Sequence, residues 1–291
     1  MNTCTRLKEL LNSGTTLVVP DAYDPISARI IEQCGFMAVQ CSGGSYSISR
    51  GYKSEADISY QDNLEQTRQI VQAVNIPVMA DGEDGYGDAE VINKTIRDFI
   101  AAGTAGINIE DQIISREGPT RIIERQAMIE KIIAAKEAKR AAGSPDFIIN
   151  ARTDALKVSA DRSANSKEAI ERANHYLAAG ADLVFVAYAD TLEEVALLQK
   201  EIQGPLSIAA GLPYNIRAFS INDLIGLNLA RISLPMIMIQ SSIQGMLKSL
   251  ATIKESNSFQ EILDNGLVCT NEDLAIVQNR VSINVKAILS K

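Results

Sequence analysis

The chain has 291 residues, with 36 acidic and 28 basic side chains and a formal net charge of -8. The acidic balance, the absence of a basic stripe and an aromatic content of 5% without tryptophan argue against nucleic acid as the main partner. Hydrophobic residues make up 46% of the chain, enough to build a large core, which excludes global disorder.

No apolar run reaches the roughly 18 residues of a membrane-spanning helix, so no membrane partner is expected. Residues 1–11 alternate polar and apolar side chains and lack the apolar core of a signal peptide. The four cysteines lie far apart without a CxxC pair, as expected for reduced thiols. We therefore expect a cytoplasmic protein.

Short apolar runs alternate with longer amphipathic stretches along the chain. The runs are continuously apolar, which is typical of parallel strands covered on both faces. They predict strands near residues 16–20, 36–41, 76–80, 105–109, 147–151, 181–186, 205–209 and 229–234. Helical patterns fall at about residues 24–35, 61–74, 89–103, 124–142, 166–179, 191–202, 216–227 and 237–251.

This alternation of strands and helices predicts an α/β protein with a (β/α)8 TIM barrel. A doubly wound sheet is the alternative, but it normally has fewer strands, and no GxGxxG motif follows the first strand. Without a linker or repeat, we expect one barrel domain over residues 1–291. Residues 255–291 would form a C-terminal helical extension that covers the barrel or reaches a neighbouring subunit.

Carboxylates concentrate after the third and fourth predicted strands, at the end where barrel enzymes place their chemistry. Adjacent strands lie about 5 Å apart, so these side chains would repel one another unless a cation were bound. Oxygen ligands favour Mg2+, with Mn2+ as an alternative. Acidic residues that only cap helices are the competing interpretation. The residues concerned are Asp81, Glu83, Asp84, Asp88, Glu110 and Asp111.

Two further features suggest an anionic substrate. Ser42-Gly43-Gly44 is a glycine-rich turn whose backbone N–H groups could face an anion. Arg152 ends the fifth predicted strand and could grip a carboxylate or phosphate. The single histidine, His175, lies in a helical pattern, where we expect a surface residue. We interpret Cys41 as a small buried residue rather than a nucleophile.

Five segments together resemble the isocitrate lyase/phosphoenolpyruvate mutase superfamily, in order and spacing from about residue 5 to 250. VMADGEDGYGDAE is similar to that family's D-A-D-T-G-Y-G metal motif, INIEDQ to its I-E-D segment and INARTDAL to its A-R-T-D-A segment. CSGGS resembles its substrate-binding Ser-Gly-Gly turn, and VVPDAYDPISARI its opening motif.

The resemblance implies a (β/α)8 barrel whose last helix is swapped between subunits, in homo-oligomers that are dimers or tetramers. It implies Mg2+ and a small anionic substrate, a 2-oxoacid or related dicarboxylate. Asp81, Glu83 and Glu110 would hold the metal, and Asp81 would also lie at the substrate. Ser42, Gly43 and Gly44 would bind the substrate carboxylate. Arg152 would neutralise developing charge as a catalytic residue, and Tyr23 would line the pocket.

The departures from the family concern the reaction. The gate at residues 113–123, IISREGPTRII, is shorter and has neither the catalytic cysteine nor the histidine of the lyases. Its candidates are Arg116, Glu117 and Thr120, with Tyr23 and Tyr188 as pocket alternatives. The catalytic residues that we name are Arg152, Tyr23 and Glu117. A family Asp falls at Ser54, a Glu at Ala187 and an Asn at Ala209. A normal isocitrate lyase, methylisocitrate lyase or phosphoenolpyruvate mutase is therefore not expected.

The leading hypothesis is a Mg2+-dependent lyase or decarboxylase that cleaves a C–C bond in a small 2-oxo or 2-hydroxy di-acid through a metal-stabilised enolate. One alternative is a P–C bond hydrolase or phosphomutase acting on phosphonopyruvate or phosphoenolpyruvate. The other is a non-catalytic homologue that only binds a 2-oxoacid.

Overall fold

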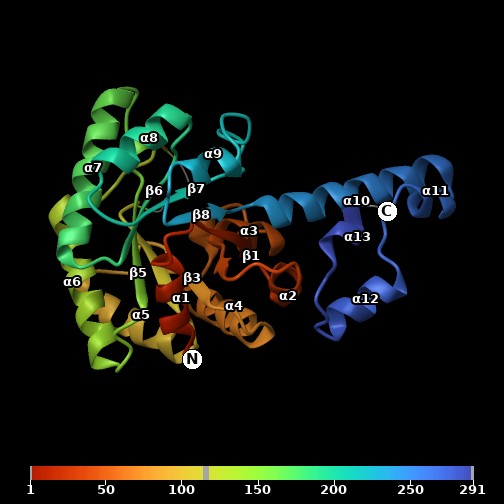
Figure 1. Ribbon diagram of the computed structural model, residues 1–291, viewed down its shortest axis with the longest axis horizontal. Coiled ribbons are helices and arrows are strands. Elements are labelled where there is room, and N and C mark those ends of the chain that lie inside the picture. The colour runs from red at the N-terminus through yellow and green to blue at the C-terminus, as the bar shows by residue number, and fades with distance from the viewer. Residues whose placement is uncertain (1, 114–117, 290–291) are drawn as a thin grey trace.

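The computed structural model describes residues 2–113 and 118–289. Its eight strands are parallel and close into a barrel in chain order, because β8 pairs with β1 (Figure 1). The strands are β1 (Leu17–Ala22), β2 (Val39–Cys41), β3 (Val78–Asp81), β4 (Gly106–Glu110), β5 (Ile148–Thr153), β6 (Leu183–Val186), β7 (Leu206–Ala209) and β8 (Arg231–Leu234). The predicted (β/α)8 barrel is confirmed.

Helices surround the barrel and bury their apolar faces against it. Many begin at a side-chain cap: Asp24 accepts a hydrogen bond from Ser27 N at 2.7 Å, and Pro25 follows at the first helical position. The helices are α1 (Thr3–Leu11), α2 (Pro25–Gln33), α3 (Gly43–Ser49), α4 (Tyr60–Ala73), α5 (Ala89–Ala101), α6 (Arg125–Ala141), α7 (Arg162–Ala179), α8 (Leu192–Glu201), α9 (Ile221–Gly226), α10 (Ile237–Ser256), α11 (Gln260–Asp264), α12 (Asn271–Gln278) and α13 (Val285–Leu289). Two 3-10 turns are η1 (Glu55–Asp57) and η2 (Ala155–Lys157).

The structure differs from the predicted elements at three helices. The sequence pattern does not predict α1 or α3, and α9 is shorter than the expected stretch 216–227. Glycine and serine are weak helix formers, so the sequence of α3, GGSYSIS, hides a helix that the Ser42 cap starts. A reciprocal cap between Ser220 and Asp223 starts α9 later than its apolar pattern indicates.

Alternate residues of each strand point into the barrel, and below its mouth this interior is polar. Arg231 is fully buried and donates to Gln40 Oε1 at 2.8 Å and to Ser207 Oγ at 3.2 Å. Asp21 accepts from Ser233 Oγ at 3.0 Å. Burial raises the pKa of Asp21 to about 8, although Arg231 opposes the shift.

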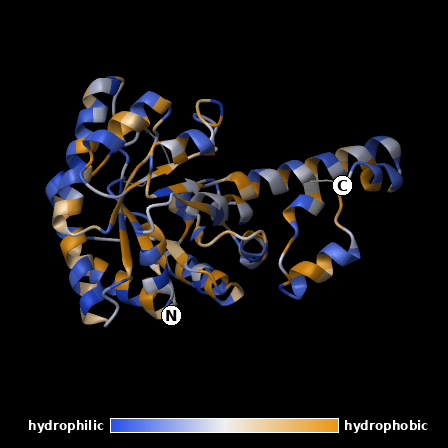
Figure 2. Cartoon of the chain, in the orientation of Figure 1, coloured by the Kyte–Doolittle hydropathy of each residue, from blue (hydrophilic) through white to orange (hydrophobic). Residues whose placement is uncertain are grey.

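A C-terminal arm, α10 to α13, leads away from the barrel (Figure 1). Ile239 is the buried residue of α10, while apolar side chains farther along the arm are exposed. The hydropathy colours show hydrophobic residues recurring along the arm (Figure 2). The arm returns to the barrel at α12, where Ile276 O accepts from Gln33 Nε2 at 2.9 Å. The arm therefore includes most of α10 as well as the expected extension 255–291. The exposed apolar residues are Met246, Leu247, Leu250, Phe259, Leu263, Val268, Leu274, Val281, Val285 and Ile288.

The structure also bears on the predictions for the histidine, the cysteines and membrane-spanning helices. His175 is exposed on α7, as expected, and all four cysteines are free thiols, with Cys41 buried. Burial raises the pKa of Cys41 to about 12, which suits a packing residue rather than a nucleophile. Within the described ranges, no helix is both long enough and apolar enough to cross a bilayer.

Candidate active site

Arg152 is fixed between two carboxylates at the carboxyl end of β5. The strand register sets Glu110 of β4 directly beside it, and Arg152 Nη1 lies 2.7 Å from Glu110 Oε2. On the other side, Arg152 Nε and Nη2 donate to Asp154 Oδ1 at 2.7 Å and Oδ2 at 3.0 Å. Both carboxylates are buried, whereas the arginine side chain is 20% exposed. A guanidinium has five N–H donors, so these bonds leave donors for a ligand.

A second acidic group lies at the end of β3, against the glycine turn. Gly43 N donates to Asp81 Oδ2 at 3.0 Å. A Cβ added to Gly43 would lie 2.2 Å from Glu83 Oε1, so only glycine lets this turn approach the acidic residues. Glu83 itself has the left-handed φ of 50°, a strained conformation that is common at functional sites. Ser42 Oγ accepts from Ser45 N at 3.2 Å and so caps α3.

Glu55 is a site residue that the sequence reasoning missed. It lies on η1 and reaches the same turn, because a Cβ on Gly44 would lie 2.5 Å from Glu55 Oε1. The family resemblance placed an Asp at the neighbouring Ser54, whose hydroxyl instead caps η1 by accepting from Ala56 N at 3.1 Å. The sequence signal for Glu55 was that an acidic residue directly follows Ser54, the position at which the family has an Asp.

The acidic residues disfavour one another's charged forms. Burial raises the pKa of Glu83 well above its ordinary value, and repulsion from Asp81, Glu55 and Glu110 adds to the shift. Burial also raises the pKa of Glu110, although Arg152 opposes it. Burial also raises the pKa of Glu55, and repulsion from Asp81 adds to the rise. A bound cation would relieve this repulsion.

The residues present fit a magnesium ion. Glu83 Oε1 is buried without a hydrogen-bond partner in the described part of the chain, so it is a free ligand atom. Across residues 2–113 and 118–289, no three His, Cys, Asp or Glu side chains converge closely enough to hold a metal by themselves. Mg2+ is usually bound through one or two carboxylates while keeping several waters, and Asp81 with Glu83 can supply that number.

Three carboxylates of the predicted cluster have structural roles instead. Asp84 Oδ1 accepts from Tyr86 N at 2.8 Å, and Asp88 caps α5. Asp111 is fully buried and accepts from Tyr176 Oη at 2.8 Å and from Arg172 Nη1 at 3.2 Å. The helix-cap interpretation thus holds for Asp88, and the active-site group is smaller than the sequence pattern indicates.

The predicted catalytic residues differ in where the structure places them. Arg152 lies at the centre of the site. Tyr23 follows β1, but its hydroxyl is hydrogen-bonded to Ser242 Oγ of α10 at 2.8 Å, which connects it to the arm. Arg116 and Glu117 lie outside the described residues.

Comparison with known proteins gives a consistent family. A model described as phosphoenolpyruvate phosphomutase matches residues 7–254. The chain is 32% identical over 209 residues to 2,3-dimethylmalate lyase of Eubacterium barkeri, covering 70% of each protein. It is 30% identical over 205 residues to a 2-methylisocitrate lyase of Halalkalibacterium halodurans, covering 69% of this chain but only 65% of that protein. A structure of phosphoenolpyruvate phosphomutase from Streptomyces platensis subsp. rosaceus superposes with a TM-score of 0.85 and 25% identity over 96% of both chains.

Proposed function

Because the chain belongs to the phosphoenolpyruvate phosphomutase family, within the isocitrate lyase/phosphoenolpyruvate mutase superfamily, we propose that it is a Mg2+-dependent lyase or decarboxylase. Its substrate would be a small 2-oxo or 2-hydroxy di-acid in which a C–C bond breaks. The observation that supports this proposal is the position of Arg152. Its Nη1 lies 2.7 Å from Oε2 of Glu110, the last residue of the strand that follows the acidic turn. Two lyases among its relatives support the reaction class.

Asp81 and Glu83 would hold Mg2+, or alternatively Mn2+, with Glu110 beside them. When bound, the ion would act as a Lewis acid toward a substrate oxygen. The remaining N–H donors of Arg152 would stabilise negative charge on that oxygen, which is the C2 alkoxide of a 2-hydroxy acid before cleavage or the enolate oxygen that forms from a 2-oxoacid during cleavage. Gly43 and Gly44 let the turn lie against Glu83 and Glu55, and the backbone N–H groups of this turn would bind the substrate carboxylate.

For a 2-hydroxy di-acid, the C2–C3 bond breaks and its electron pair remains on C3, which takes up a proton. The C2 hydroxyl loses its proton and becomes the keto group of a 2-oxoacid. We propose Glu117 of the gate as the donor of the C3 proton, with Tyr23 near the arm as the alternative. For oxaloacetate, the C3–C4 bond breaks instead: C4 leaves as CO2, its bonding electron pair forms the enolate of pyruvate, and C3 then takes up a proton to give pyruvate.

The test is turnover by the purified protein with Mg2+, measured as pyruvate formed from oxaloacetate, 2-methylmalate and phosphonopyruvate. We expect pyruvate from a carbon substrate without release of phosphate. Phosphate from phosphonopyruvate would instead identify the P–C enzyme. If no substrate turns over but Mg2+ with oxalate raises the melting temperature, the protein is a non-catalytic binder.

Asp81→Asn provides the variant test, with Asp88→Asn as its matched control. Both changes remove one carboxylate charge from the same loop, but only Asp81 lies at the glycine turn. Asparagine caps helices as well as aspartate, so Asp88→Asn should keep α5 and full turnover. We expect Asp81→Asn to lose turnover and to abolish the Mg2+-dependent thermal shift without unfolding. Equal loss in both variants would contradict the site.

We also propose that the protein is a homo-oligomer, a dimer or tetramer, in which the arm packs on a second copy. The support is the row of exposed apolar residues on α10, including Leu247 and Leu250, which are 59% and 65% exposed in the single chain. Light scattering should give a multimer that Leu250→Glu dissociates. Ile216→Glu, at a similarly exposed site outside the arm, should not. A monomeric wild-type protein would refute the proposal.

The free thiols support the expected cytoplasmic location. A finding of the mature protein in an oxidising compartment would contradict it.

A further inference from the structure

The half of the barrel mouth formed by β6 and β7 is apolar, in contrast to the acidic half. Neither 183–188 nor 206–211 contains a charged residue. Phe185, Ala187 and Ala209 are buried together, with Tyr188 and Leu212 packed against them. We name these five residues the apolar wall.

The strand register shows that the apolar wall faces the site rather than the surrounding helices. Phe185 is the register partner of Arg152, whose side chain points into the mouth. Phe185 in turn pairs with Ser207, which binds the interior Arg231. Because every second residue of a strand has the same direction, Ala209 points inward like Ser207. Ala187, the first residue after β6, is buried together with Phe185 and Ala209. The Arg152 guanidinium lies 5.5 Å from the centre of the Phe185 ring.

Two tyrosines complete this side without adding charge. The rings of Tyr188 and Tyr214 lie 5.5 Å apart. Burial raises the pKa of Tyr188 to about 12, so its hydroxyl is neutral at neutral pH. The exposed Lys157 places its ammonium 4.4 Å from the centre of the Tyr188 ring, as a cation–π contact.

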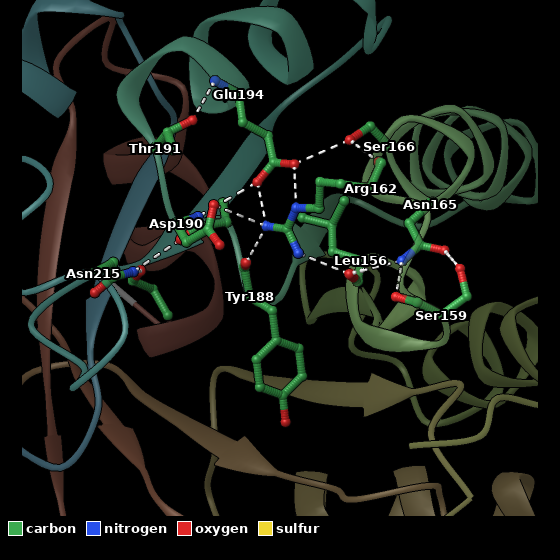
Figure 3. Close-up of polar contacts among 12 residues, drawn as sticks. Leu156, Ser159, Arg162, Asn165, Ser166, Tyr188, Asp190, Thr191, Glu194 and Asn215 are labelled. Carbon is green, nitrogen blue, oxygen red and sulfur yellow. Dashed lines mark hydrogen bonds and ion pairs between the residues drawn. The ribbon is translucent and has the colours of Figure 1, made fainter. Parts of the chain in front are cut away.

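A polar network behind the wall holds it in position (Figure 3). Arg162 donates to Tyr188 O at 2.6 Å and forms an ion pair with Glu194, where Nε and Oε1 are 2.8 Å apart. Asn215 Nδ2 donates to Ala189 O at 3.1 Å and to Ala209 O at 2.9 Å, which connects the ends of β6 and β7. Figure 3 shows the Tyr188 ring pointing away from the ion pair. A wall fixed in this way is preorganised to contact a ligand.

We propose that the apolar wall binds an alkyl branch on the substrate carbon that leaves, and that the substrate is an alkyl-branched di-acid rather than a tricarboxylic acid. The proposal rests on the proposed C–C lyase function and names its substrate class. The cations beside the wall are Arg152, which is already paired with Glu110 and Asp154, and the exposed Lys157. A further carboxylate on the leaving fragment would therefore be desolvated against the wall without a buried cation of its own, which is costly. A methyl group there gains from burial instead.

The experiment compares 2-methylmalate with 2,3-dimethylmalate, which differ by one methyl group on the leaving fragment. Cleavage gives pyruvate from both, with acetate from the first and propionate from the second. We expect kcat/KM to be about 10- to 200-fold higher for 2,3-dimethylmalate, the range for one methylene-sized group in an apolar pocket. The third substrate, 2-methylisocitrate, would give pyruvate and succinate, and it should be the poorest.

Ala209→Asn tests the wall directly, because it sets an amide where the methyl group would lie. We expect it to reduce the preference for 2,3-dimethylmalate over 2-methylmalate by at least 10-fold. Ala218→Asn, at an exposed position after β7, should leave the preference unchanged. If Ala209→Asn fails to fold, the smaller change Ala209→Ser serves in its place.

The results distinguish a failure of the apolar wall as the specificity site from a failure of the lyase function. Equal kcat/KM for the two methylmalates, or faster turnover of 2-methylisocitrate, would overturn the apolar wall as the specificity site while leaving the lyase function intact. Pyruvate from oxaloacetate alone would likewise overturn the substrate class, whereas no pyruvate from oxaloacetate or from any of the three substrates would refute the proposed function itself.

Discussion

Replacing Gly43 with alanine should separate ligand binding from folding at the acidic turn. The added Cβ would lie 2.2 Å from Glu83 Oε1 and 3.3 Å from Asp81 Oδ2. Van der Waals contacts are normally about 3.5 Å, so the Glu83 carboxylate must move by roughly 1 Å. Gly43 is the first residue of α3 and is not in the left-handed region, so alanine fits its backbone.

We expect Gly43→Ala to change the free energy of unfolding only slightly and to weaken ligand binding strongly. Glu83 Oε1 has no hydrogen-bond partner in the described ranges, so its movement breaks no bond there. Alanine is favoured over glycine within a helix by about 0.5–1 kcal/mol, and the free energy of unfolding should change by no more than about 1 kcal/mol. A misplacement of roughly 1 Å can cost about 100-fold in activity, and we expect a loss of that order in Mg2+-dependent oxalate affinity.

Calorimetric titration of oxalate with Mg2+ present measures the binding, and urea unfolding measures the stability. Gly226→Ala is the matched control, because Gly226 also lies in a helix but a Cβ there would meet nothing within 4 Å. Unchanged oxalate affinity in Gly43→Ala would show that the turn does not adjoin the ligand. A large loss of stability would show that Glu83 cannot move aside as argued.

Two further predictions concern the buried polar groups. Asp111→Ala should lower the free energy of unfolding by about 3–5 kcal/mol, because it removes the carboxylate from the buried Arg172 and Tyr176; a loss below about 1 kcal/mol in urea unfolding would contradict this role. The folded pKa of Asp21, about 8, lies above its ordinary 3.8, so the folded state binds the extra proton and stability is lost as pH rises through about 8. Asp21→Asn mimics the protonated form, and its melting temperature should fall less than that of the wild type between about pH 6 and pH 9; parallel curves would refute the buried neutral carboxyl.

The sequence pattern did not show which individual carboxylates of the motif lie in the active site. The motif VMADGEDGYGDAE contains five acidic residues, and four of them, Asp81, Glu83, Asp84 and Asp88, come before the first residue of α5. Of these, the structure brings Asp81 and Glu83 to the glycine turn and gives Asp84 and Asp88 to local backbone N–H groups. Spacing along a loop does not decide between these uses, because the direction of each side chain depends on φ angles such as the left-handed one at Glu83.

Glu55 shows the same limit over a longer distance. It is more than 20 residues from Asp81 in the chain, and only its position next to Ser54, where the family has an Asp, marks it as a site residue. Only the folding of η1 against α3 brings its carboxylate to Gly44. Tyr23 shows the reverse case, because its motif suggested a pocket residue while its hydroxyl is engaged by Ser242 of the arm.

The sequence by itself determined the barrel, the order of its strands and the position of Arg152 and the glycine turn at their carboxyl ends. It could do so because apolar runs bounded by polar residues report burial, which local composition encodes directly. Only the tertiary structure decided which carboxylates share the mouth, that β6 and β7 form an apolar wall opposite them, and that α10 leaves the barrel with its apolar residues exposed. Those features depend on which way a side chain points and on what packs against it, and both are set by contacts between residues that are distant in the chain.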